Sequence, residues 1–381
     1  MTARSSFSGI QTLFLLLLLP PLLSADAAAQ TAPDSGTPPV ARERAIELYE
    51  GARYAEAREL LEKLDGQQKL DGPLLYRLFF CQRAAGDAVA TETLSRAIQR
   101  LEQDAASSSD LEAPFYLVNA YASLNRAADL ERVAASATAR IENGQLSPPA
   151  TAMDRFRLGK LYADQGRSVE AERWYAEALD SFAAQGEGRS VAYVRWAAGY
   201  LAQANFDRED FVEAERYFSI LLEAEEPTMG DLDRLAVIRS RLGMYVEAAQ
   251  LWRRAELLAP AQANRARYCY RLVETAASLE DLSAAAPDGR LWTQLTKEQL
   301  EAILQQQVAE VQAVRQEAEE SAPLDQEQRG RLQGRLDAVR PIFVGAALEY
   351  ALQGYSIREA AFFGGYATLI FKAKEWQLPR R

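Results

Sequence analysis

The sequence has 381 residues, of which 48% are hydrophobic, so it is long enough to bury a sizeable core. Its 54 acidic residues outnumber its 43 basic ones, and the net charge of −11 argues against binding to nucleic acid or to anionic membrane surfaces. It contains no histidine, which removes the commonest general base, the commonest zinc ligand and every nucleophile–histidine dyad.

The first 29 residues have the composition of a secretory signal peptide. Arg4 precedes an apolar run from Leu13 to Leu23, and the small residues Ala27–Ala29 offer a cleavage site before Gln30. The run is shorter than the roughly 20 apolar residues that cross a membrane. We therefore expect an exported protein, periplasmic or secreted, with no membrane span after cleavage; an uncleaved anchor is the alternative. Residues 30–40 are polar and rich in proline, and are predicted to be a disordered lead-in.

Helical periodicity begins at residue 41 and continues through three weakly related segments to residue 144. The first segment places Tyr54, Ala57 and Leu61 on one face of a helix, and the other two keep fewer positions of the same pattern. The following residues, 145–151, contain two prolines and are predicted to be a linker, which is either a long turn or a hinge.

The clearest pattern in the chain lies at residues 152–185. It predicts two antiparallel helices, in which small residues let the backbones approach and tyrosines fill the gaps. Gly166 is predicted to end the first helix, because a residue with positive φ is favoured there. The positions that carry the pattern are Leu158, Gly159 and Tyr162 on the first helix and Ala171, Tyr175 and Ala178 on the second.

The same pattern recurs twice further along the chain. Ala248 lies 34 residues after Ala214, and each is followed four residues later by an aromatic residue, Trp252 and Phe218 respectively. The preceding interval, from Ala171 to Ala214, is longer, at 43 residues. The extra residues of the longer interval fall around 186–194, which we interpret as a longer loop and an extended first helix. Residues 152–285 are thus predicted to be repeats closed by a capping helix.

These residues and the spacing of 34 resemble the tetratricopeptide repeat family. The resemblance is strong for residues 152–262 and degenerate for residues 41–144. It implies an all-α fold, a right-handed α-solenoid of helix pairs, whose first helices line a concave groove for a protein or peptide partner. It implies neither a cofactor nor an enzymatic activity.

Carrying the groove positions of the family onto this sequence gives a set of candidate partner-binding residues. They are polar, charged and aromatic side chains on the predicted first helices of successive pairs. The set is Tyr76, Phe80, Arg83, Phe115, Asn119, Phe156, Lys160, Asp164, Trp196, Gln203, Phe206, Asp207, Asp233, Val237, Arg241, Arg267 and Arg271.

Residues 286–381 fall outside the repeat pattern and are predicted to be a small helical domain with an aromatic tail. Thr296 and Gln299 form a predicted capping box before a helix that reaches about Glu320, and Asp325 is predicted to cap the next helix. Eight aromatic residues follow between Phe343 and Trp376. They predict either a closing core or an exposed patch that binds a partner.

Three functions agree with the sequence. The preferred one is an exported scaffold that binds a peptide or a helical partner in a cell-envelope assembly. The second makes the repeats a recruiting arm for an enzymatic C-terminal domain with Glu349, Tyr350, Glu359 and Tyr366 as its candidate groups. The third is a structural envelope component whose tail docks on a membrane protein.

The two cysteines lie far apart in the predicted solenoid and are expected to be free, buried thiols. The oligomeric state is not predicted.

Overall fold

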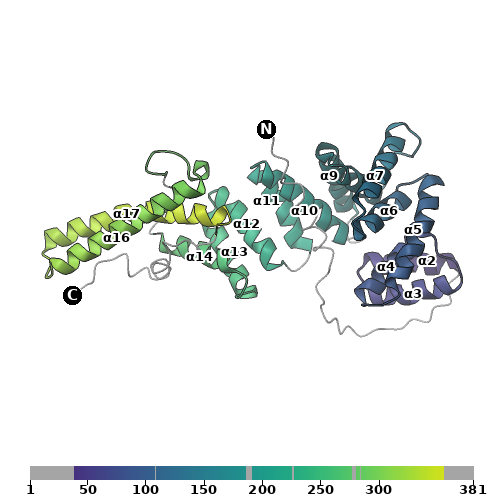
Figure 1. Ribbon diagram of the computed structural model, residues 1–381, viewed down its shortest axis with the longest axis horizontal. Helices are drawn as coiled ribbons and strands as arrows, with labels where there is room; N and C mark the ends of the chain where they lie inside the picture. Colours follow the sequence, from purple (N-terminus) through teal and green to yellow (C-terminus); the bar gives the residue numbers. More distant parts are fainter. Residues whose placement is uncertain are drawn as a thin grey trace. The chain divides into compact units, whose positions relative to one another are not determined.

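The computed structural model describes residues 38–107, 109–185, 191–224, 227–276, 280–283 and 285–355. Within these ranges every regular element is a helix and none is a strand (Figure 1). The chain divides into two compact units, residues 1–197 and 198–381, and the boundary falls within helix α10. The predicted signal peptide and the aromatic residues beyond Tyr355 lie outside the described residues.

The first unit is built from consecutive helices, each of which packs against the next. In addition, α2 contacts α4, α4 contacts α6, and α6 contacts α8, so the first helices of successive pairs also touch one another. This is the helical repeat arrangement that the sequence predicts. The helices are α2 (Pro38–Glu50), α3 (Tyr54–Gly66), α4 (Gly72–Ala84), α5 (Ala90–Ser107), α6 (Glu112–Ser123), α7 (Ala127–Glu142), α8 (Ala152–Asp164) and α9 (Ser168–Ala184).

The start of α2 corrects one predicted boundary. The helix begins at Pro38, inside the stretch that was expected to be a disordered lead-in. Proline suits the first turn of a helix, because its fixed φ is helical and its missing N–H has no partner to lose there. The predicted linker at 145–151 connects α7 to α8 within the first unit, and Leu146 is buried there.

The pair α8–α9 shows how the sequence pattern specifies this packing. A Cβ atom at Gly159 would lie 2.9 Å from the ring of Tyr175, so only glycine lets that ring cross the helix. Ala171, Tyr175 and Ala178 have no exposed surface. Gly166 has φ of 71° and follows the end of α8, as predicted. Thr151 caps the start of α8 by accepting a hydrogen bond from the Asp154 backbone N–H.

The second unit repeats the arrangement and then departs from it. In its repeat part α11 packs against α12, α12 against α13, and α13 against α14. Gly243 has φ of 77° before α13, and Ala248, Trp252 and Ala255 have no exposed surface, which agrees with the predicted repeat. The helices are α10 (Val191–Asp207), α11 (Phe211–Ala224), α12 (Met229–Arg241), α13 (Tyr245–Leu258) and α14 (Asn264–Thr275).

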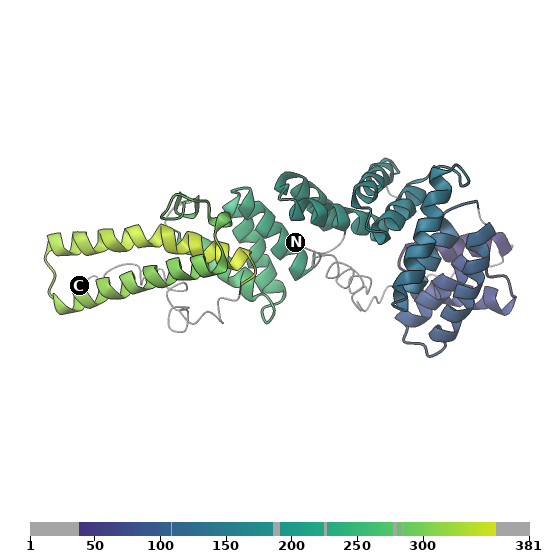
Figure 2. The ribbon, with the colours of Figure 1, turned by 45° about the horizontal axis from the view of Figure 1, so that its top comes forward.

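A long helical hairpin follows the repeats. Figure 2 shows α16 (Lys297–Glu320) and α17 (Gln326–Leu352) side by side, and their packing buries an apolar stripe that includes Leu304, Val311 and Leu336. The capping box at Thr296 and the cap at Asp325 are both present, as predicted. The short elements α15 (Glu280–Ser283) and η2 (Trp292–Gln294) precede the hairpin, and α17 packs against both of them and against α14.

Both cysteines are free and buried, as predicted. Burial raises the pKa of the Cys81 thiol to about 12 and also raises the pKa of Cys269. Both thiols are therefore protonated at neutral pH and poor nucleophiles.

Candidate functional site

The first helices of the first unit bury several of the predicted binding residues. Tyr76, Phe115 and Phe156 are 7%, 4% and 0% exposed. Their rings pack against aromatic residues of neighbouring helices, as in the pair Phe115–Phe156, whose centroids lie 6.1 Å apart. In this structure these three side chains form the core and offer almost no surface to a partner.

Lys160, another predicted residue, contacts two further ones, Asp164 and Trp196. The Lys160 ammonium donates to the Asp164 carboxylate at 2.7 Å, and it lies 5.2 Å from the centroid of the Trp196 ring. The Lys160 and Asp164 side chains are only 7% and 14% exposed. Of the remaining predicted residues in this unit, Phe80 and Asn119 are half-buried and Arg83 is exposed.

A buried ionic cluster joins the first helices of this unit. The guanidinium of Arg77, which is 1% exposed, donates to Glu112 at 2.8 Å and lies 4.6 Å from the centroid of the Tyr116 ring. Arg157 donates to the same Glu112 carboxylate at 3.1 Å. Burial opposes ionisation of Glu112, but the two arginines outweigh it and lower the pKa of the carboxyl group. The cluster holds α4, α6 and α8 together.

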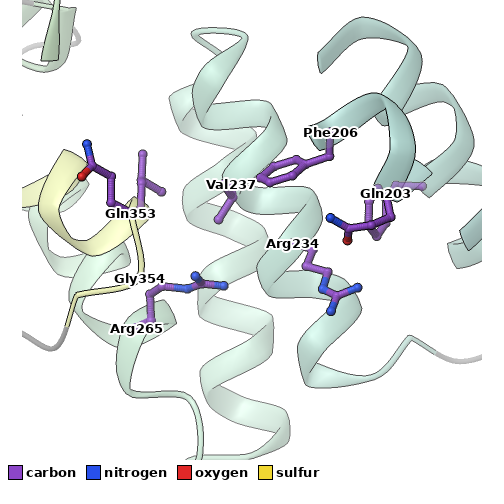
Figure 3. A pocket seen from close by; sticks show the side chains of 9 residues that line it. Gln203, Phe206, Arg234, Val237, Arg265, Gln353 and Gly354 are labelled. Carbon is purple, nitrogen blue, oxygen red and sulfur yellow. The ribbon is translucent and has the colours of Figure 1, made fainter. Parts of the chain in front are cut away.

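A pocket of about 310 Å³ lies in the second unit (Figure 3). Residues from α10 face α12 from one side, while Arg265 at the start of α14 and the end of α17 approach from the other. The volume is at the lower end of the range of ligand pockets, about 300–1,000 Å³, and suits an anchor of a few side chains. The lining residues are Gln203, Phe206, Phe218, Arg234, Val237, Arg265, Leu352, Gln353 and Gly354.

Most polar groups around the pocket are already paired. The Gln203 amide donates to Asp207 at 2.7 Å, and the Arg265 Nε donates to Asp233 at 2.9 Å. The Gln353 amide donates to Glu349 at 2.9 Å. Arg234, which is half-buried, has neither an ion pair nor a hydrogen bond from its side chain to any residue in the described ranges. The pocket thus combines an unneutralised guanidinium with four apolar side chains and with polar groups that are already paired.

The structure brings three predicted binding residues, Gln203, Phe206 and Val237, together in this pocket. It also adds Arg234 and Arg265, which the transferred groove positions missed. Arg234 lies three residues before Val237, so helical spacing places it on the same face of α12. The sequence alone could therefore have placed Arg234 beside Val237. The contribution from the end of α17 had no signal in the sequence, because it depends on how the hairpin folds back onto the repeats.

The other predicted residues of the second unit have structural partners. Asp233, 8% exposed, accepts from the Trp252 Nε1 at 3.1 Å as well as from Arg265. Arg267 pairs with Glu256 and Arg271 with Glu274, at 2.9 and 2.7 Å. Arg241 forms a two-pronged ion pair with Glu349, whose side chain is 4% exposed. For all of them, partner binding stays a prediction.

Two candidate groups for a C-terminal enzymatic activity are engaged in the same way. Glu349 is held by Arg241, and the hydroxyl of Tyr350 donates to Glu301 at 2.8 Å. Glu359 and Tyr366 lie outside the described residues. Within the ranges that the structure describes, no cluster of three or more Cys, Asp or Glu is placed to hold a metal ion. No helix found there has the length and apolar character to cross a membrane.

The solved structures that are similar to this chain include one tetratricopeptide repeat structure. That structure is the C-terminal part of a TPR repeat-containing protein from Cytophaga hutchinsonii. The two sequences are 14% identical, the match covers 78% of this chain and 95% of that chain, and the TM-score is 0.28. No protein-family model and no curated protein matches the sequence. The description of the fold therefore rests on the helix pairs themselves.

Proposed function

We propose that this protein is an exported tetratricopeptide-type scaffold that holds a peptide segment of a partner protein in a cell-envelope assembly. The observation that carries the proposal is the pocket on α10, α12 and α14. α10 and α12 are the first helices of consecutive pairs, the elements that repeat proteins of this kind use for partners, and α14 is the capping helix that follows them. Export is supported by the apolar run at Leu13–Leu23 and the small residues that follow it.

The pocket suits a peptide anchor better than the first-unit residues do. Tyr76, Phe115 and Phe156 are enclosed by their neighbours, so a partner could reach them only after the helices separated. The pocket, in contrast, already presents the half-buried side chains of Gln203 and Phe206 beside Val237. A preformed site of this kind avoids the entropic cost of ordering the protein when the ligand binds.

Site-specific photocrosslinking in intact cells tests both the export and the binding face. With a photoreactive phenylalanine analogue at Gln203, we expect a covalent adduct with a partner protein, recovered from the envelope or secreted fraction. The control position is Gln250, which is exposed on α13, the second helix of its pair. Adducts of equal yield from both positions would contradict the proposed face, and an adduct found only in the cytoplasm would contradict export.

A further inference from the structure

The pocket also indicates the chemistry of the peptide that it holds. Its one charged group without a partner among the described residues is the Arg234 guanidinium, while the nearby Arg265 is neutralised by Asp233. An arginine in a partly enclosed site binds a carboxylate more strongly than a neutral group, because the hydrogen bonds between them are charge-assisted and often bidentate. The chain as a whole carries a net charge of −11 and therefore does not attract acidic peptides. The attraction of a carboxylate comes from the arginine of the pocket alone.

Four apolar side chains line the pocket together with the amides of Gln203 and Gln353. Phe218 and Val237 are 2% and 3% exposed and form a closed apolar surface beside the more open Phe206 and Leu352. The Phe206 ring is fixed by an edge-on contact with Phe211, with centroids 5.7 Å apart. An apolar ligand side chain lying against these groups would remove apolar surface from water without reordering the wall.

The backbone N–H groups that line the pocket indicate whether the carboxylate belongs to the end of a peptide or to a side chain. A peptide C-terminus is usually captured by a group of free backbone N–H donors. Gln353 and Gly354 line the pocket, but their backbone N–H groups donate to the backbone carbonyl oxygens of Glu349 and Ala351, at 2.9 and 3.0 Å, and so close the end of α17. A backbone donor group for a terminal carboxylate is therefore not provided by these residues, and the side chain of Arg234 is the available donor.

We infer that the pocket recognises an internal Asp or Glu side chain next to a large apolar side chain in the partner peptide, with Arg234 binding the carboxylate. This inference deepens the proposed function and rests on it. The apolar side chain lies against Phe206, Val237 and Leu352, and the carboxylate replaces water around the guanidinium.

Selection from a phage-displayed library of random dodecapeptides tests the inference on the full chain. Wild type, Arg234→Glu and Arg254→Glu are used in parallel; Arg254 is an exposed arginine of α13, so its substitution changes the net charge equally. We expect wild type and Arg254→Glu to enrich peptides with an acidic residue beside an apolar one. Arg234→Glu should instead enrich a basic residue at that place.

Selected sequences are then synthesised with both ends capped and titrated by fluorescence anisotropy. Changing the acidic residue to its amide is expected to weaken binding about tenfold or more to wild type, and to have little effect on Arg234→Gln. Equal binding of the acid and amide peptides, with binding still lost in Phe206→Ala, would overturn the inference and leave the proposed function standing. Peptides that bind only with a free C-terminus would also overturn it. Absence of any enriched peptide would count against both.

Discussion

Replacing Arg241 by alanine is expected to destabilise the second unit by about 3–5 kcal/mol. Arg241 on α12 forms two hydrogen bonds with Glu349 on α17, one of them at 3.0 Å, and the Glu349 side chain is 4% exposed. Without the guanidinium, this carboxylate keeps only the Gln353 amide among its described partners and stays buried. The free energy of unfolding, measured with a chemical denaturant, should fall accordingly, and hydrogen exchange should speed up in α12 and α17.

Two further variants distinguish the loss of this ion pair from a general effect of removing an arginine. Arg216→Ala removes an exposed arginine that pairs with Glu213 on α11, where the side chains are 59% and 41% exposed, and should cost about 1 kcal/mol or less. The double variant Arg241→Met, Glu349→Met should recover most of the stability, because apolar replacement of both partners leaves no buried charge. If Arg241→Ala behaved like Arg216→Ala, the ion pair would not anchor the hairpin.

The second large effect is expected from Arg77→Met in the first unit. Methionine keeps much of the side-chain volume but removes the donor to Glu112 and the charge over the Tyr116 ring. Because the Glu112 side chain is 28% exposed and retains Arg157 as a partner, the expected loss is below the range for a buried charge left unpaired, about 2 kcal/mol. Arg132→Met, at an exposed arginine that is paired with Asp129, should change the stability by less than about 1 kcal/mol.

The same cluster predicts a dependence on pH. The folded state lowers the pKa of Glu112, so its ionisation stabilises folding above the carboxyl group's ordinary pKa of 4.5 and ceases to do so as the pH falls through the lowered value. The stability difference between wild type and Glu112→Gln should therefore be largest near pH 7 and shrink steadily below about pH 4.5. A difference that stays constant down to pH 3 would mean that the charge of Glu112 does not stabilise the cluster.

The repeat geometry could be predicted from the sequence because it depends on local residue types. Gly166 supplies the positive φ after α8, Ala171 has no exposed surface, and Thr296 caps α16, each by a rule that acts within a few residues. Asp325 caps α17 by the same kind of rule. The free, buried cysteines were predicted from another argument, the distance between their two segments along the solenoid.

The roles of individual side chains could not be predicted in the same way. Arg241 occupies a groove position in sequence, but its partner Glu349 is 108 residues away, and only the fold of the hairpin brings the two together. Phe156 is enclosed by rings from neighbouring helices, including Tyr193 at 4.8 Å between centroids. Arg234 was missed although it lies on the same face of α12 as Val237, because positions transferred from a family do not include charges specific to this chain.

Filling the pocket tests the central claim most directly. Gln203→Trp places an indole at the pocket, whereas Gln250→Trp makes the same change at an exposed position on α13. A capped peptide with the sequence crosslinked from Gln203 is titrated against both variants and wild type by calorimetry. We predict that Gln203→Trp weakens binding by about tenfold or more, while Gln250→Trp stays within about twofold of wild type. Equal affinities for the two variants would contradict a partner site in this pocket.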